Sequence, residues 1–137
     1  MAVLTEAEVN EQAELGYVRG NYYVALTNSV TPYTSTLNYT TVQADEVTTG
    51  AGGYSRLSFT YTTADLIAYS NGQPIEEKLA IFVHDGSSAD IVFNHVVLLR
   101  EVSGTYSVVG YQQIEDGVVL SDGESAQIKI NILLSSG

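Results

Sequence analysis

The chain has 137 residues and no cysteine, which is enough for one domain with a hydrophobic core and excludes disulfides and thiolate metal sites. Its formal net charge is −11 with only five basic residues, so the composition argues against binding to nucleic acid or to an anionic membrane surface. Charged residues make up only 15%, against roughly 25% in an average domain, so the surface is mostly neutral and polar and suits contacts between copies of one protein.

The first twenty residues are predicted to form a short helix or arm. Thr5 and Glu8 have the spacing of a capping box, and Gly16 is a suitable helix end. A thin apolar stripe lies between them, formed by Ala7, Val9, Ala13 and Leu15. A helix this short needs the sheet or a neighbouring copy to pack on. No basic residue precedes Arg19 and no stretch has the roughly 20 apolar residues that span a bilayer, so we expect neither a signal peptide nor a membrane anchor.

After Gly20 the apolar periodicity changes to that of β-strands. Strands are predicted over residues 22–27 and 56–61, and residues 36–42 between them alternate only weakly. Loops and turns are expected at Thr31-Pro32 and at residues 50–53, because Pro and Gly interrupt regular structure.

Two near-continuous apolar runs follow, residues 79–83 and 91–99, separated by a turn over residues 85–88. A strand with one solvent face alternates between apolar and polar residues, so these two runs are expected to be covered on both faces. The opposing sheet is the expected cover on one side, and the N-terminal helix or another subunit on the other.

The C-terminal part is also predicted to be strand. Residues 106–113 and 118–120 are expected to be separate strands interrupted at Asp116-Gly117, and residues 126–134 form a regularly alternating last strand. The whole pattern of eight or nine short strands predicts an all-β fold, an antiparallel β-sandwich or barrel. We expect residues 1–20 to be the arm and residues 21–137 to be a single β-sandwich domain.

The two histidines are the first candidates for chemistry. His84 and His95, with Asp85 or Asp90, have the residue types of a metal site, but a polar residue that closes a buried strand is the commoner case. The oxygen-rich segment 85–90 suits a hard cation, yet it lacks the EF-hand spacing, and turn chemistry explains its acids. We therefore predict no metal and no cofactor.

No motif for catalysis is present: the chain has no nucleophile elbow, no phosphate-binding loop and no zinc-protease motif. We therefore expect no enzyme. Ten tyrosines and several asparagines make a carbohydrate-binding module the alternative from a different class, because tyrosine rings on the surface can stack on sugars.

One resemblance to a known family is carried by short segments. The stretch VALTNSVTP at residues 24–32 and the stretch GYSR at residues 53–56 resemble small virion structural proteins of tailed bacteriophages. Residues 119–124, VLSDGE, are similar to the last hairpin of those proteins. The acidic N-terminal segment and the long middle section depart from the pattern. The resemblance implies a jelly-roll-like sandwich that works in symmetric oligomers.

These observations together predict a non-enzymatic virion structural protein, made in the host cytoplasm. The expected role is a capsid decoration (cement) protein, a homotrimer that binds the major capsid protein or other virion proteins and stabilises the shell. A tail, baseplate or fibre component is the alternative within the class. The expected interface residues are Leu4, Val9, Leu15, Val97 and Leu99, with residues 1–16 as the docking element.

Overall fold

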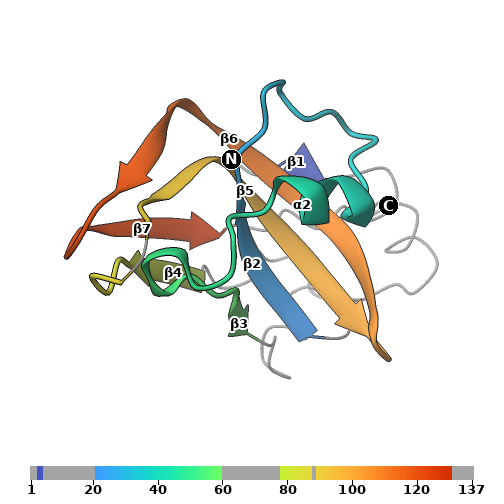
Figure 1. Ribbon diagram of the computed structural model, residues 1–137. Coiled ribbons are helices and arrows are strands. Elements are labelled where there is room, and N and C mark those ends of the chain that lie inside the picture. Colours follow the sequence, from blue (N-terminus) through green and yellow to red (C-terminus); the bar gives the residue numbers. More distant parts are fainter. Residues whose placement is uncertain (1–2, 5–20, 60–77, 88, 131–137) are drawn as a thin grey trace.

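The computed structural model describes residues 3–4, 21–59, 78–87 and 89–130, and the structural account is confined to them. The chain forms two antiparallel sheets packed against each other, with one short helix on the outside (Figure 1). The elements in chain order are β1 (Val3–Leu4), β2 (Asn21–Thr27), α2 (Tyr39–Asp45), the 3-10 turn η1 (Ala51–Gly53), β3 (Leu57–Phe59), β4 (Lys78–Val83), β5 (Ile91–Val102), β6 (Thr105–Leu120) and β7 (Ser125–Ile130).

The larger sheet has five strands in the order β1-β6-β5-β2-β3, and the smaller sheet pairs β4 with β7. Every pairing is antiparallel, and β5 lies at the centre, where Val97 is opposite Ala25 of β2 on one side and Tyr111 of β6 on the other. The predicted all-β antiparallel sandwich is confirmed. The jelly-roll topology remains a prediction.

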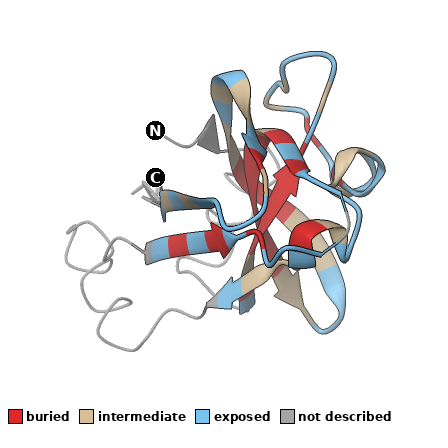
Figure 2. Ribbon diagram, turned by 60° about the vertical axis from the view of Figure 1, so that its left-hand side comes forward, coloured by how far each residue is buried: buried red, intermediate tan, exposed pale blue. Residues whose placement is uncertain are grey.

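The main hydrophobic core lies between the two sheets, where alternate residues of each strand point inward. Its fully buried members include Val24, Leu26, Ile91, Phe93 and Val109, and Phe82 enters from the smaller sheet. Figure 2 shows the buried residues concentrated along the central strands, with the exposed ones on the loops and turns. This core accounts for the alternation of β7, whereas β2 is buried on both faces from Val24 to Thr27.

A second core lies on the outer side of the five-stranded sheet, beneath α2. Val42 is the one buried residue of the helix, and it packs with Val97 and Leu99 of β5. The expectation that the run at residues 91–99 is covered on both faces is therefore confirmed for residues 95–99, whereas Val92 near its start is exposed. The second cover at Val97 and Leu99 comes from α2 of the same chain, which corrects the expected cover by the N-terminal helix or another subunit.

Residues 39–45 form a helix, which the weak alternation of residues 36–42 did not indicate. Asn38 explains the start of α2, because its extended backbone and its side chain make it an N-cap: Oδ1 accepts the backbone N–H of Thr41 at 3.0 Å. The threonines of this segment favour strands intrinsically, and the cap together with the burial of Val42 outweighs that preference.

Two further expectations need correction. The run at residues 79–83 was expected to be covered on both faces, but only Ala80 and Phe82 are buried, so the strand has one covered face. Asp116 and Gly117 do not end a strand, because β6 continues through them with both residues at a φ of 67°. The register with β5 shifts between Phe93 and His95, which makes this a bulge within one strand.

Several predictions fall on residues that the structure does not describe. The helix predicted between Thr5 and Gly16 lies outside the described residues, as do residues 60–61 and 131–134 of two predicted strands. Val3 and Leu4 are described and form β1, which pairs with β6. At these two positions the N-terminal segment is strand.

Candidate functional site

The predicted interface residues lie in different surroundings. Val97 and Leu99 are completely buried beneath α2, so a neighbouring copy has no access to their side chains in this structure. Leu4 belongs to β1, where it is opposite Gly110 of β6. Val9 and Leu15 lie outside the described residues.

An uncovered row of aliphatic side chains lies on the outer face of β4. Leu79, Ile81 and Val83 are 54%, 44% and 55% exposed. They alternate along the strand with Ala80 and Phe82, which point into the core. Across the smaller sheet, the three exposed residues are opposite Lys129, Gln127 and Ser125 of β7. The strand therefore presents an apolar face where its neighbour presents a polar one.

A second exposed apolar pair lies on the other sheet. Val92 of β5 and Val119 of β6 are directly opposite each other and are 41% and 55% exposed. Their neighbours Ile91, Phe93 and Leu120 belong to the core between the sheets. Because side chains alternate along a strand, the pair points away from that core and hence away from the β4 row.

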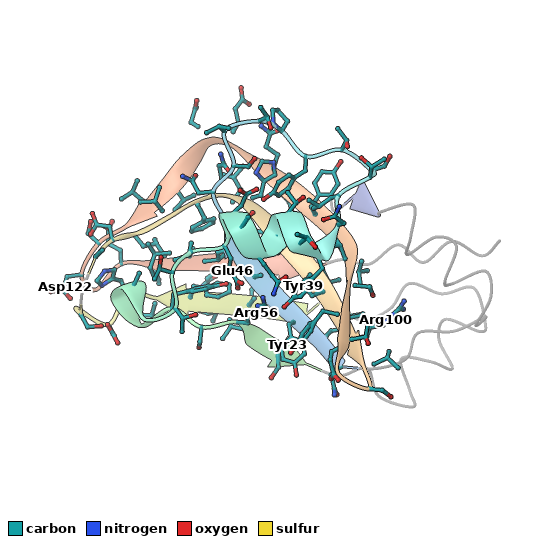
Figure 3. All side chains as sticks on the ribbon, turned by 45° about the vertical axis from the view of Figure 1, so that its right-hand side comes forward. Tyr23, Tyr39, Glu46, Arg56, Arg100 and Asp122 are labelled. Carbon is teal, nitrogen blue, oxygen red and sulfur yellow. The ribbon has the colours of Figure 1, made fainter. Side chains whose placement is uncertain are left out.

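A cluster of three tyrosines and one arginine lies beside α2. The ring of Tyr39 stacks on that of Tyr106 with centroids 5.0 Å apart and an interplanar angle of 11°. Tyr23 packs against Tyr106 at 5.6 Å, and the guanidinium carbon of Arg56 lies 5.3 Å from the centroids of both stacked rings. Figure 3 shows Tyr39, Arg56 and Glu46 close together below the helix.

Arg56 is held in place by Glu46. Nε of Arg56 donates to Oε2 at 2.8 Å and Nη2 donates to Oε1 at 2.7 Å, while Nη1 donates to the hydroxyl of Tyr39 at 3.0 Å. Tyr54 also donates to Oε2, at 2.6 Å. Burial alone raises the pKa of Glu46, but the hydrogen bonds from Arg56 and Tyr54 outweigh it and lower that pKa below its usual value.

His95 is a buried structural residue. Its Nε2 accepts the backbone N–H of Tyr33 at 3.4 Å, and its Nδ1 lies 2.7 Å from Oδ1 of Asn94, which also accepts the backbone N–H of Ser29. These partners assign the proton to Nδ1 of a neutral ring. Burial lowers the pKa of His95, and Asp45 opposes that shift. The ring therefore anchors the loop at residues 28–38 to the sheet.

His84 closes the neighbouring loop in the same way. It is 4% exposed, its Nε2 lies 3.0 Å from the carbonyl oxygen of Ala89, and its Nδ1 accepts the backbone N–H of Gly86 at 3.0 Å. Asp85 uses its carboxylate to accept two hydrogen bonds from Ser87. Within the described part of the chain no group of His, Asp and Glu is arranged to hold a metal ion.

Two hollows open on the surface near these features. The larger, of about 590 Å³, is lined by three acids, Asp45, Glu46 and Asp90, together with loop backbone and Val92. Glu46 is bound to Arg56, and Asp45 accepts the hydroxyl of Tyr33 at 2.8 Å. The smaller, of about 370 Å³, lies between the loop before α2 and the start of β6 and includes Tyr39 and Tyr106 in its wall.

Sequence reasoning missed both the β4 row and the pairing of Arg56 with Glu46. For the row a signal was present in the sequence, since the polar Gln127 and Lys129 mark the outer face of the partner strand. The strand register that places Ile81 opposite Gln127, however, cannot be deduced from the local sequence of either strand. For Arg56 and Glu46, ten residues apart, no local motif exists.

Comparison with protein-family models, with curated proteins and with solved structures finds no match for this chain. Among the described residues, no helix has the length and apolar character needed to cross a bilayer.

Proposed function

We propose that this chain is a non-enzymatic structural protein of a phage virion that acts through contacts with other protein chains. Within that class we propose a capsid decoration protein, a homotrimer that binds the major capsid protein and stabilises the shell. The virion setting and the trimer rest on the sequence resemblance. The contact function rests on the uncovered apolar row of β4.

The row supports a contact function because moving exposed aliphatic side chains from water into a protein interface is favourable, and this stabilisation is gained only when another surface covers them. Single exposed apolar residues are ordinary on a protein surface, whereas three in a row on one strand face are not. Leu79, Ile81 and Val83 are each close to half exposed, although the chain places small or polar residues on the facing strand. We take this face as the surface that a second copy of the chain covers.

The pair Val92–Val119 supports assembly in more than one copy. It lies on the sheet opposite the β4 row, so one copy has two apolar patches and can contact two neighbours at once. Each subunit of a cyclic trimer makes two such contacts, through two different patches.

The polar groups support a role without catalysis. His84, His95, Arg56 and Glu46 all have hydrogen-bond partners that hold loops or strands together. A catalytic acid, base or nucleophile needs access to a substrate, and these four groups are engaged in the fold.

The test is the oligomeric state of the wild type and of two matched variants, measured by size-exclusion chromatography with light scattering. Ile81→Glu places a charge in the middle of the β4 row, and we expect it to shift the oligomer towards monomer. Val30→Glu is the control, because Val30 is fully exposed in a loop and away from the row. A monomeric wild type, or an oligomer equally sensitive to both changes, would contradict the contact proposal.

The virion role needs a separate measurement. Electron microscopy of virions from the phage that encodes the chain should show it on the outer shell. Density at the tail, the baseplate or a fibre would replace the decoration role with the alternative of the same class.

A further inference from the structure

The smaller hollow has a lining unlike the rest of this surface. The rings of Tyr39 and Tyr106 form part of its wall, and Ser35, Thr36, Asn38 and Ser107 contribute to the remainder, with two aliphatic residues. None of the lining residues carries a formal charge. The 16 acidic residues of the chain all lie outside this lining.

The contrast with the larger hollow indicates the ligand class. Three carboxylates line the larger one, so it favours cations. The smaller one offers neutral donors and acceptors beside aromatic rings, and the chain as a whole, at −11, repels anions. A neutral ligand that has both hydroxyl groups and an apolar C–H face fits this combination.

The rings are held in position before any ligand arrives. Tyr39 and Tyr106 stack on each other, and the hydroxyl of Tyr39 accepts a hydrogen bond from Arg56, which Glu46 fixes in turn. Tyr23 also packs against Tyr106, with the ring centroids 5.6 Å apart. A wall that is already ordered loses little conformational entropy on binding.

Asn38 provides directional polar groups at the rim. Its Oδ1 caps α2 by accepting from Thr41, so the cap does not use the Nδ2 donors. Asn38 is exposed, and the start of α2 fixes its backbone. It is therefore placed to donate hydrogen bonds to hydroxyl oxygens.

We propose that this hollow binds a neutral saccharide, with the solvent-exposed parts of the Tyr39 and Tyr106 rings contacting C–H groups of a sugar and Asn38 donating to its hydroxyl groups. A volume of about 370 Å³ accommodates one or two sugar units of a longer chain. The inference is independent of the contact function, since none of its residues belongs to the β4 row.

The test titrates the ¹⁵N-labelled full chain with maltohexaose, xylohexaose, mannohexaose and chitohexaose, following amide shifts by NMR. We expect at least one of these probes to bind, with shifts centred on residues 35–39 and 106–108. Tyr106→Leu should weaken that binding at least about tenfold, and Tyr106→Phe by less than about threefold, because the ring is the contact.

Asn38→Asp provides a variant that keeps the fold, because Asp caps a helix as well as Asn does. It replaces the donors of Asn38 with a charge, and we expect it to weaken binding about tenfold. Asn28→Asp is the matched control in the larger hollow and should leave the affinity unchanged.

Three results would overturn the proposal: no probe bound below about 10 mM, shifts centred elsewhere, or an affinity that Tyr106→Leu and Asn38→Asp leave intact. Ile81→Glu separates this inference from the contact function. That variant should lose the oligomer and keep the saccharide affinity, and loss of both would show that the hollow needs the assembled form, which contradicts the site as proposed.

Discussion

Arg56 binds both carboxylate oxygens of Glu46 through two hydrogen bonds, of 2.8 Å from Nε and 2.7 Å from Nη2. The same carboxylate accepts the hydroxyl of Tyr54, whose oxygen in turn accepts the backbone N–H of Leu26 at 3.0 Å. The end of α2, the segment before β3 and the buried strand β2 are thereby joined through side chains. With side-chain exposures of 21% and 15%, the ion pair is largely shielded from water.

Removing the guanidinium should destabilise the fold. Arg56→Met leaves the largely buried carboxylate of Glu46 without its cation, and we expect the free energy of unfolding to fall by about 2–3 kcal/mol. Arg56→Lys keeps the charge but not the planar fork, so it should retain only part of the stability. Urea denaturation followed by circular dichroism measures both changes.

The control for Arg56→Met is Glu101→Gln, since the Glu101 carboxylate lies at the surface where it contacts Asn21 and the backbone of Gly104, and its change should cost much less than that of Arg56. The pH dependence adds a second check. Because the folded-state pKa of Glu46 is lowered, its stabilisation is present above its unfolded value of about 4.5 and is lost as the pH falls through the folded value. In Arg56→Met this part of the acid destabilisation should be smaller.

His95 should make the fold sensitive to mild acid. Burial lowers its folded-state pKa below the unfolded value of about 6.5. Above that value both states are neutral at His95. As the pH falls below it, the unfolded state takes up a proton first, so stability decreases until the folded pKa is reached.

We expect the urea midpoint of the wild type to fall between pH 7.5 and 5.5, and that of His95→Gln to fall less, although the variant is less stable at the higher pH. An NMR titration of the imidazole in the wild type should give a pKa below 6.5. Equal slopes for the two proteins, or an unshifted imidazole, would show that the ring is not buried as described.

Gly52 should tolerate no side chain. Its φ is +56°, and a Cβ there would overlap the ring of His84, which is itself fixed by Gly86 and Ala89. We expect Gly52→Ala to cost about 3 kcal/mol, because backbone strain adds to the displacement of a buried ring.

Gly50→Ala is the matched control for this change. Gly50 also has a positive φ, of +92°, but a Cβ at that position meets no atom within 4 Å. Backbone strain alone should cost about 1–2 kcal/mol. Thermal unfolding of both variants compares the two costs, and equal losses would mean that the contact with His84 is not part of the effect.

The strands that could be predicted from the sequence are those whose apolar residues follow a regular local pattern. Residues 22–27, 91–99 and 126–130 correspond to β2, β5 and β7, because apolar periodicity directly encodes which side of a strand faces a core. The helix at residues 39–45 was not predictable from periodicity. The residues of this segment favour strand, and the burial of Val42 against β5 stabilises the helix instead.

For the proposed sites too, the sequence indicated the residue types but not which residues come together. The tyrosine count suggested a sugar-binding surface, but no local rule pairs Tyr39 with Tyr106, since 66 residues of chain separate them and the sheet brings them together. The β4 row looked like a doubly buried strand, because an apolar run does not reveal how many faces are covered.

The sequence by itself determined the β character of the chain, its low content of charged residues and the absence of a known catalytic motif, since composition and periodicity are local properties. Only the tertiary structure decided which apolar residues remain exposed, which tyrosines stack and which acid holds Arg56. Those relationships depend on strand register and sheet packing, which bring together residues far apart in the chain.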